Sequence, residues 1–210
     1  MRPVLALIGD LIGSKRAPQR AALQRRLAHT LQAVSPAASA LASPYTLTLG
    51  DEFQAVYHGS ESVVRDVLTI MAALHPARVR FAIGVGPLAT AINPDQALGM
   101  DGPAFHHARS AMEAMKRVGT TLRVEGEPSG RWEPKNHILA YVGHHMESWS
   151  GNRLAILRDR LEAIPASEMA EKLGISRVAV HKNIRIAALD DVAAMCHDLT
   201  AALQEALTEA

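Results

Sequence analysis

The segment at residues 45–57, YTLTLGDEFQAVY, constrains the fold of this chain more than any other. Apolar residues alternate with other residues on both sides of an acidic corner, residues 50–52, and this period of two predicts a β-hairpin. Two acids at the tip of a hairpin are in most proteins only good turn chemistry, because a solvated turn needs polar residues. Another carboxylate favours a functional interpretation: Asp10 ends the only other strongly apolar strand in the first half of the chain, residues 4–8.

Composition excludes several classes of protein. A chain of 210 residues with 48% hydrophobic and 20% charged residues is neither disordered nor fibrous. The formal net charge of +1 means that any nucleic-acid binding must rest on a local patch. The single cysteine, Cys196, cannot form an internal disulfide, which fits a reducing cytosol. No apolar run approaches the roughly 18 residues of a membrane span, so we expect a cytoplasmic protein without a membrane partner.

The periodicity of the first part of the chain predicts the order strand, helix, hairpin, helix, strand, helix, strand. The predicted segments are the strand at 4–8, a helix carrying Leu23, Leu27, Leu31 and Val34, the hairpin at 45–57 after a connector at 36–44, a helix capped by Ser60 and closed by Pro76, the strand at 79–85, a helix from about Asp101 that Asp101 caps, and a strand at about 120–124. Two βαβ-like halves sharing one sheet form the ferredoxin-like plan. We expect its helices on one face, with the other face free to pair in a homodimer.

A stretch rich in Gly, Pro and Ser at residues 125–133 marks the best domain boundary, and the pattern beyond it is helical. We therefore predict an α+β fold, with a ferredoxin-like domain at residues 1–128 followed by an all-α domain at 129–210. The last predicted helix, from about 190 to 207, has an apolar stripe that can pack against a partner subunit or against its own domain.

Residues 165–188 within the helical domain fit a helix-turn-helix. Ala170 is small where two helices must touch, Gly174 supplies the turn, and Ser176 can cap the second helix. Val180 and Ile184 would bury the inner side of that helix.

The second of these helices predicts a DNA contact. It would expose Arg177, His181, Lys182, Asn183 and Arg185 in varying degree. No acidic residue occurs from 172 to 189, which suits a helix in a major groove. We expect Arg177 and His181 to face bases, and Lys182 and Arg185 to meet phosphates. Residues 149–210 hold seven Lys/Arg and nine Asp/Glu, so a role in protein contacts or dimerisation stays open.

The ferredoxin-like plan brings Asp10 and Asp51 to one sheet edge, with Glu52 beside them. Such carboxylates can hold Mg²⁺ or Mn²⁺ while phosphate oxygens and water fill the other positions. Gly13, just after the first strand, lets the backbone approach phosphates closely. We predict a metal site at Asp10, Asp51 and Glu52.

The motifs at these positions resemble those of known families. Asp10-Leu11-Ile12-Gly13 resembles the first metal-binding turn of class III nucleotidyl cyclases, and residues 49–53 resemble the GGDEF signature of diguanylate cyclases with its first glycine replaced. The whole set over about residues 4–190 resembles the SatD family: Gly9-Asp10 with Ser14-Lys15, Gly50-Asp51-Glu52-Phe53-Gln54, Arg80-Phe81-Ala82-Ile83-Gly84-Val85-Gly86, and Asp101-Gly102-Pro103-Ala104-Phe105 with Ala108-Arg109. The resemblance implies a palm-like, nucleotidyl cyclase-like domain joined to a helix-turn-helix.

The resemblance also implies roles for single residues. The candidates for nucleotide binding are Ile12, Gly13, Ser14, Lys15, Arg109 and Lys116. Leu47 stands where adenylyl cyclases of this class place a base-reading lysine, and the nearest candidates for their transition-state pair are His106 and Arg109, three residues apart instead of four. Arg109 can instead simply pair with Glu113. These departures favour nucleotide or metal binding over efficient cyclisation.

Two hypotheses follow. The first is a cytoplasmic regulator that binds a nucleoside triphosphate or cyclic nucleotide with Mg²⁺ or Mn²⁺ and binds DNA through its helix-turn-helix. The alternative is a nucleotidyl cyclase-like or nucleotide-hydrolysing enzyme that uses Asp10 and Asp51 as metal ligands.

Overall fold

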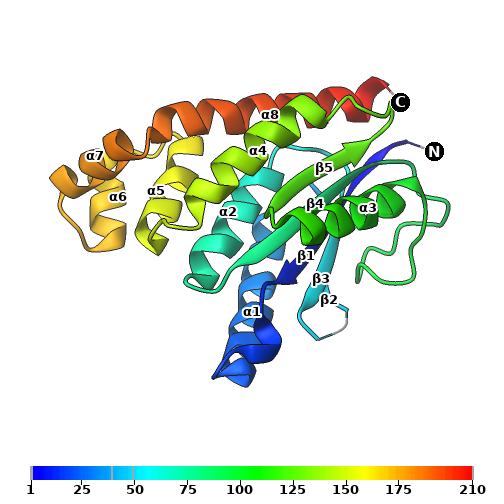
Figure 1. The fold of residues 1–210 in the computed structure, drawn as a ribbon, viewed down its shortest axis with the longest axis horizontal. Helices are drawn as coiled ribbons and strands as arrows, with labels where there is room; N and C mark the ends of the chain where they lie inside the picture. Colours follow the sequence, from blue (N-terminus) through cyan, green and yellow to red (C-terminus); the bar gives the residue numbers. More distant parts are fainter. Residues whose placement is uncertain (1, 39, 49, 210) are drawn as a thin grey trace.

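The structure is a computed structural model that describes residues 2–38, 40–48 and 50–209. A mixed α/β part comes first: β1 (Val4–Leu11), α1 (Arg20–Val34), β2 (Leu41–Leu47), β3 (Glu52–Tyr57), α2 (Val63–Leu74), β4 (Val79–Gly86), α3 (Pro103–Val118) and β5 (Leu122–Gly126). Helices follow: α4 (Glu133–Met146), α5 (Gly151–Leu161), α6 (Ala166–Leu173), α7 (Arg177–Ile186) and α8 (Leu189–Glu209) (Figure 1). No helix in these ranges has the length and apolar character that a membrane crossing requires.

The five strands form one sheet in the order β2-β3-β1-β4-β5. β1 is antiparallel to both of its neighbours, β3 and β4, whereas β5 runs parallel to β4. The predicted order strand, helix, hairpin, helix, strand, helix, strand is present, and the strand predicted at about 120–124 is β5 at one edge of the sheet. β2 begins before the predicted hairpin, at Leu41. Two register shifts between Leu41 and Thr46 interrupt its period of two, so the alternation of the sequence does not reveal this part of the strand.

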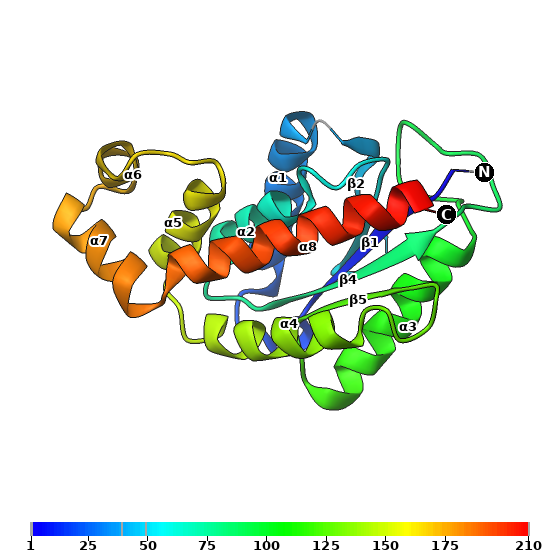
Figure 2. The ribbon, with the colours of Figure 1, turned by 90° about the horizontal axis from the view of Figure 1, so that it is seen from above.

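Both faces of the sheet are covered. Leu5 and Leu7 of β1 point to the same side as α1 and α2, whereas Ala6 and Ile8 point to the side where α3 packs. Figure 2 shows α3 on the opposite side of the sheet from α1 and α2. The prediction of one free face was therefore wrong, and the argument for a homodimer that rested on it no longer holds.

The loop between β4 and α3 completes the cover on the α3 side. The Gln54 side-chain amide donates to the Ala97 carbonyl, and the Ala97 amide donates to the Thr46 hydroxyl at 2.8 Å. Ala97 and Met100 join the core with α3. A region in which the sequence shows few secondary-structure signals is thus fixed against β2 and β3.

Gly84 sets how closely α3 approaches the sheet. A Cβ atom at this position would collide with the Ala104 carbonyl oxygen and the Ala108 amide nitrogen, both backbone atoms of α3. The small side chains of Ala104 and Ala108, both fully buried, face the same contact. The glycine is required because a helix backbone lies directly on the strand.

The C-terminal helices share the core of the sheet. The hydrophobic core runs without interruption from β1, β3 and β4 through α2 into α5, α7 and α8. The predicted stripe of α8 packs against its own chain, because Val192, Leu199 and Leu203 are buried while Met195 stays 43% exposed. Ser60, predicted to cap α2, instead donates to the Thr200 carbonyl of α8 at 2.9 Å, and the α2 N-cap position is held by Ser62.

The contact at Gly84 gives a testable prediction. Gly84→Ala should lower the free energy of unfolding by about 1–3 kcal/mol, because the new methyl group must push α3 away from β4. Gly151→Ala is a matched control, since a Cβ there meets nothing closer than 3.5 Å and the residue begins a helix. Urea unfolding of both variants measures the difference, and equal stability would show that α3 does not lie this close.

Candidate functional site

A cleft opens at the end of β1, beside the tip of the β2–β3 hairpin. It has a volume of about 660 Å³. Its charged lining comes from six separate segments: the end of β1, the turn that follows it, the start of α1, the hairpin tip, β4 and α3. The charged residues are Asp10, Lys15, Arg16, Arg20, Asp51, Glu52, Arg80 and Lys116.

Sheet register and one hydrogen bond place the two aspartates together. Asp10 pairs across the sheet with Glu52 on β3 and with Arg80 on β4. Asp51 precedes β3 by one residue, and its carboxylate accepts a hydrogen bond from the Ser14 hydroxyl. Ser14 is only 3% exposed, so the turn after β1 is tied to the hairpin tip by a buried contact. Asp10 and Asp51 therefore face one cleft although 41 positions separate them.

Asp10 lies in an environment that opposes its ionisation. Burial raises the pKa of its carboxyl above the usual range, and the nearby charge of Asp51 raises it further. The positive charges of Lys116 and Arg80 lower the pKa of Asp10, and the Arg80 guanidinium lies 3.3 Å from the Asp10 carboxylate. The net direction is upward, so a further cation between the two aspartates would relieve their repulsion.

Basic side chains surround these carboxylates. Lys15, Arg16, Arg20, Arg80 and Lys116 all line the cleft. The Arg80 Nε–H is buried and has no hydrogen-bond partner within the described part of the chain. A buried donor without a partner is costly, so it marks a position where an acceptor oxygen fits.

The two aspartates of the cleft could hold a divalent ion whose remaining ligands come from a phosphate group and water. No group of three or more His, Cys, Asp or Glu side chains is arranged to hold a metal among residues 2–38, 40–48 and 50–209. Glu52, predicted as a third ligand, accepts a hydrogen bond from the Thr48 hydroxyl at 3.3 Å within its own hairpin. Mg²⁺ needs only one or two carboxylates when phosphate oxygens complete its shell, and Asp10 and Asp51 supply two.

Two of the predicted residues lie elsewhere. Arg109 and His106 are exposed on the first half of α3 and do not line the cleft, whereas Lys116 on the last turn does. The His106 Nε2 atom lies 2.9 Å from Asp101 Oδ1. Asp101 does not cap α3, whose N-cap is Gly102.

The pairing of Arg109 with Glu113 considered above is not formed; the Glu113 carboxylate instead lies 3.3 Å from the Lys116 ammonium nitrogen.

Of the residues in the turn after β1 that are predicted to bind a nucleotide, three line the cleft and one does not. Gly13, with φ of 72°, lines the cleft together with Ser14 and Lys15. Ile12 is half-buried outside it, and its amide donates to the Arg78 carbonyl at 2.9 Å.

Three cleft residues were missed by the sequence reasoning: Arg16, Arg20 and Arg80. The one available signal was an arginine inside the otherwise apolar strand Val79–Gly86. Arg20 is the first residue of α1, and nothing in the local sequence indicates that this end of the helix borders the hairpin tip.

The α6–α7 pair has the local geometry that the sequence predicts. Gly174 takes a left-handed conformation with φ of 64° between the helices. The Ser176 hydroxyl accepts from the Ala179 amide at 3.1 Å, and Val180 is fully buried. Asn183, predicted to be exposed, is half-buried and accepts from the Arg153 side chain at 3.0 Å.

The outer face of α7 remains exposed. It carries the four predicted DNA-contacting residues, Arg177, His181, Lys182 and Arg185. Two large apolar residues, Val178 and Ile186, are 77% and 59% exposed on the same helix.

Comparisons with known proteins identify the family. The profile of the SatD family matches residues 4–191. The chain belongs to the SatD family. A search of curated proteins gave no match for this SatD-family chain.

Solved structures similar to this SatD-family protein include two of a bacterial light-regulated adenylyl cyclase. Each is 16% identical, with TM-scores of 0.45 and 0.44, and each match covers 59% of this chain. The matched region is 43% of the length of either cyclase chain.

The Asp10–Arg80 pair can be tested by stability measurements. Arg80→Met should lower the free energy of unfolding by about 1–3 kcal/mol at pH 7, because it leaves the partly buried Asp10 carboxylate without its partner. Since the pKa of Asp10 is raised in the folded protein, its charge opposes folding as pH rises above 3.8. The deficit of the variant should therefore shrink at pH 4.

Arg78→Met is the control for this measurement. Arg78 is 45% exposed and pairs with Glu147 near the surface, so its loss should cost less than about 1 kcal/mol. A deficit of Arg80→Met that stays constant between pH 4 and pH 7 would contradict the assigned role of the Asp10 charge.

Proposed function

We propose that the cleft binds a nucleoside triphosphate together with Mg²⁺ or Mn²⁺, and that α6 and α7 form a helix-turn-helix that binds DNA. In this proposal the protein is a regulator with a palm-like, ferredoxin-like nucleotide-binding part. The observation that carries the first half is the convergence of Asp10 and Asp51 on one cleft beneath five basic side chains.

The charge pattern of the cleft supports a polyphosphate ligand. Two carboxylates suit a divalent cation, and the surrounding arginines and lysines suit the oxygens of a phosphate chain that would otherwise repel those carboxylates. Arg80 is placed for both tasks, since it contacts Asp10 and keeps one buried N–H without a partner. A cleft that bound a metal ion alone would not need this basic rim.

The size of the cleft and its backbone also support a nucleotide. A volume of about 660 Å³ lies within the range of about 300–1,000 Å³ that is usual for small-molecule sites. Gly13 has no side chain to block a phosphate, and no atom lies within 4 Å of the position of a Cβ there. A cyclic nucleotide would fit the same surfaces but would leave more of the basic rim unpaired.

Binding without efficient turnover is favoured over catalysis. The candidate transition-state residues, Arg109 and His106, lie outside the cleft, and Leu47 replaces the base-reading lysine of the cyclases that the sequence resembles. The enzymatic alternative keeps one supporting observation, which is that both carboxylates remain.

Metal-dependent nucleotide binding gives a direct test. Asp10→Asn and Asp51→Asn should each weaken binding of ATP or GTP in the presence of Mg²⁺ by about tenfold or more in calorimetry, because each removes a ligand charge. Binding of the metal-free nucleotide should change little or become tighter, since the basic rim is intact. Asp95→Asn, at an exposed loop position, is the matched control.

The outcomes separate the two hypotheses. Unchanged metal-dependent affinity in both Asn variants would refute the metal site. Formation of pyrophosphate, a cyclised product or a nucleoside diphosphate on incubation with ATP or GTP and Mg²⁺ or Mn²⁺ would establish the enzymatic alternative.

The local charge balance supports DNA binding by α7. The C-terminal helices are slightly acidic in total, yet several of their acids lie in ion pairs: Asp159 with Arg158 and Lys172, Asp190 with Arg160, and Glu209 with Arg131. No acid within the described ranges pairs with Arg177, Lys182 or Arg185. The exposed face of α7 is therefore a basic surface on an otherwise acidic region.

Two substitutions test whether this surface contacts DNA. Lys182→Ala should weaken binding to all sequences alike and lower the salt slope by about one unit, because one phosphate contact is lost. Arg177→Ala should relax the preference at one base position at a cost of about 1–3 kcal/mol. Fragments of genomic DNA selected on the protein supply the binding site for both measurements.

Selection that enriches no fragment, together with equal weak binding by the wild type and Lys182→Ala, would assign α6 and α7 to protein contacts. Repeating the titration with ATP and Mg²⁺ shows whether the two sites are coupled, since coupling must change DNA affinity and nucleotide affinity by the same factor.

A further inference from the structure

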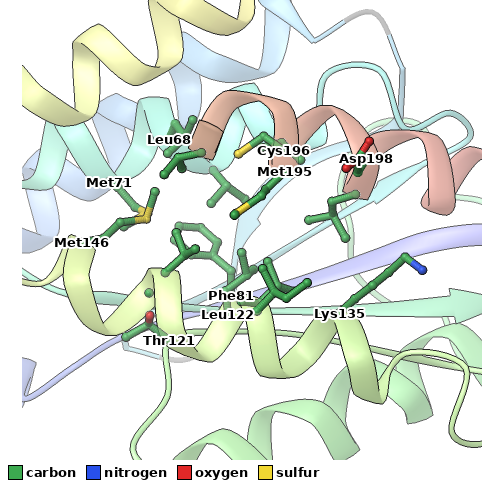
Figure 3. A pocket seen from close by; sticks show the side chains of 18 residues that line it. Leu68, Met71, Phe81, Thr121, Leu122, Lys135, Met146, Met195, Cys196 and Asp198 are labelled. Atoms are coloured by element: carbon green, nitrogen blue, oxygen red, sulfur yellow. The ribbon is translucent and has the colours of Figure 1, made fainter. Parts of the chain in front are cut away.

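An apolar cavity lies between the sheet and the C-terminal helices, away from the cleft described above. Residues from α2, β4, α4 and α8 line it, together with Thr121 and Leu122 at the start of β5, and its volume is about 110 Å³. Phe81 of β4 lies on one wall and Met195 of α8 on another (Figure 3). Large apolar side chains at its rim are exposed, with Ile138 at 46% and Met195 at 43%. The cavity is therefore open to solvent on one side.

Four of the 18 residues that line this cavity contain sulfur. Met71, Met146 and Met195 come from three different helices, and Cys196 lies next to them (Figure 3). Unbranched methionine side chains adapt to the shape of a ligand at little cost. Burial raises the pKa of the Cys196 thiol to about 12, so the thiol stays protonated and contributes an apolar surface.

Opposite charges flank one end of this cavity. Lys135 extends from α4 and Asp198 from α8 on the same side of the opening (Figure 3). Neither side chain forms an ion pair with a residue in the described ranges. Lys135 is oriented by the ring of Trp132, whose centroid lies 5.9 Å from its ammonium nitrogen.

We propose that this cavity binds a large aliphatic α-amino acid, with leucine as the reference ligand. Its side chain would occupy the apolar cavity, its carboxylate would face Lys135, and its ammonium group would face Asp198. A purely apolar ligand would leave both charges unused, and a ligand with a single charge would lie next to one group of the same sign. A zwitterion matches both charges at once.

The volume of the cavity limits the side chain of this ligand. A cavity of about 150 Å³ is known to hold benzene, so about 110 Å³ suits a branched aliphatic group better than an aromatic ring system. Leucine and methionine side chains meet this limit, and tryptophan exceeds it.

The location gives such a ligand contact with a helix that leads to the proposed DNA-binding surface. α8 begins three residues after α7 ends, and it packs on α5, α7, β4 and α2. A ligand between α8 and the sheet therefore touches the element that joins the α6–α7 pair to the rest of the core. The amino-acid site stands independently of the proposed nucleotide and DNA functions.

Methionine methyl resonances test the site without any functional assay. The chain has 8 methionines, so a ¹³C-methyl-Met spectrum of the full chain is simple. Titration with leucine should shift Met71, Met146 and Met195, whereas Met112 and Met115, on the other face of the sheet, should not move. Calorimetry should give saturable millimolar binding.

Ligand analogues and variants test the two charges. 4-Methylpentanoate lacks the ammonium group and 3-methylbutylamine lacks the carboxylate, so both should bind more weakly than leucine. Lys135→Met and Asp198→Asn should each reduce leucine affinity about two- to fivefold, as expected for exposed ion pairs. Arg25→Met and Asp191→Asn remove exposed charges elsewhere and should leave the affinity unchanged.

Met195→Trp should abolish the shifts of Met71 and Met146 by filling the cavity from its exposed rim. An unchanged thermal unfolding midpoint of this variant shows that the fold is intact. The proposal would be overturned if the three methionine resonances did not shift at about 10 mM leucine. A dissociation constant above this concentration corresponds to a binding free energy of less than about 3 kcal/mol. Equal binding of leucine and both analogues would overturn the zwitterion assignment.

Discussion

Burial of β1 on both faces and along both edges is the constraint on which the rest of the structure depends. β3 and β4 satisfy its backbone hydrogen bonds, α1 and α2 cover one set of alternate side chains, and α3 covers the other. A strand enclosed in this way has no exposed surface until its end. Asp10 is the first residue of β1 that is only partly buried, so the strand delivers its single carboxylate to the one place where solvent and ligands can reach it.

The cleft gathers carboxylates and basic side chains at one place. Asp10 and Asp51 repel each other, as the raised pKa of Asp10 shows, and the basic side chains around them are attracted to the same carboxylates. The Ser14–Asp51 and Arg80–Asp10 contacts hold this arrangement in place. In the function proposed above, a metal ion would meet the carboxylates and a phosphate chain would meet the basic side chains.

The apolar cavity has a physical origin in the way the C-terminal helices join the sheet. α4 and α8 lie along different directions over the edge formed by β4 and β5 (Figure 2). Helices that meet a sheet at different angles leave space between their side-chain layers, and flexible methionines only partly fill it. Trp132, buried at 3% exposure, lies beside Lys135, whose ammonium nitrogen is 5.9 Å from the centroid of its ring.

The sequence by itself determined the elements that depend on local physics. Period-two and helical patterns located the strands and helices, Gly174 and Ser176 marked the turn between α6 and α7, and the positions of Asp10 and Asp51 at strand ends indicated that they would meet. Tertiary structure alone decided that α3 covers the second face of the sheet, that Arg20 joins the cleft, and that Arg109 lies outside it. An apolar stripe specifies which side chains of a helix are buried but not which surface buries them, because that choice depends on contacts between residues far apart in the chain.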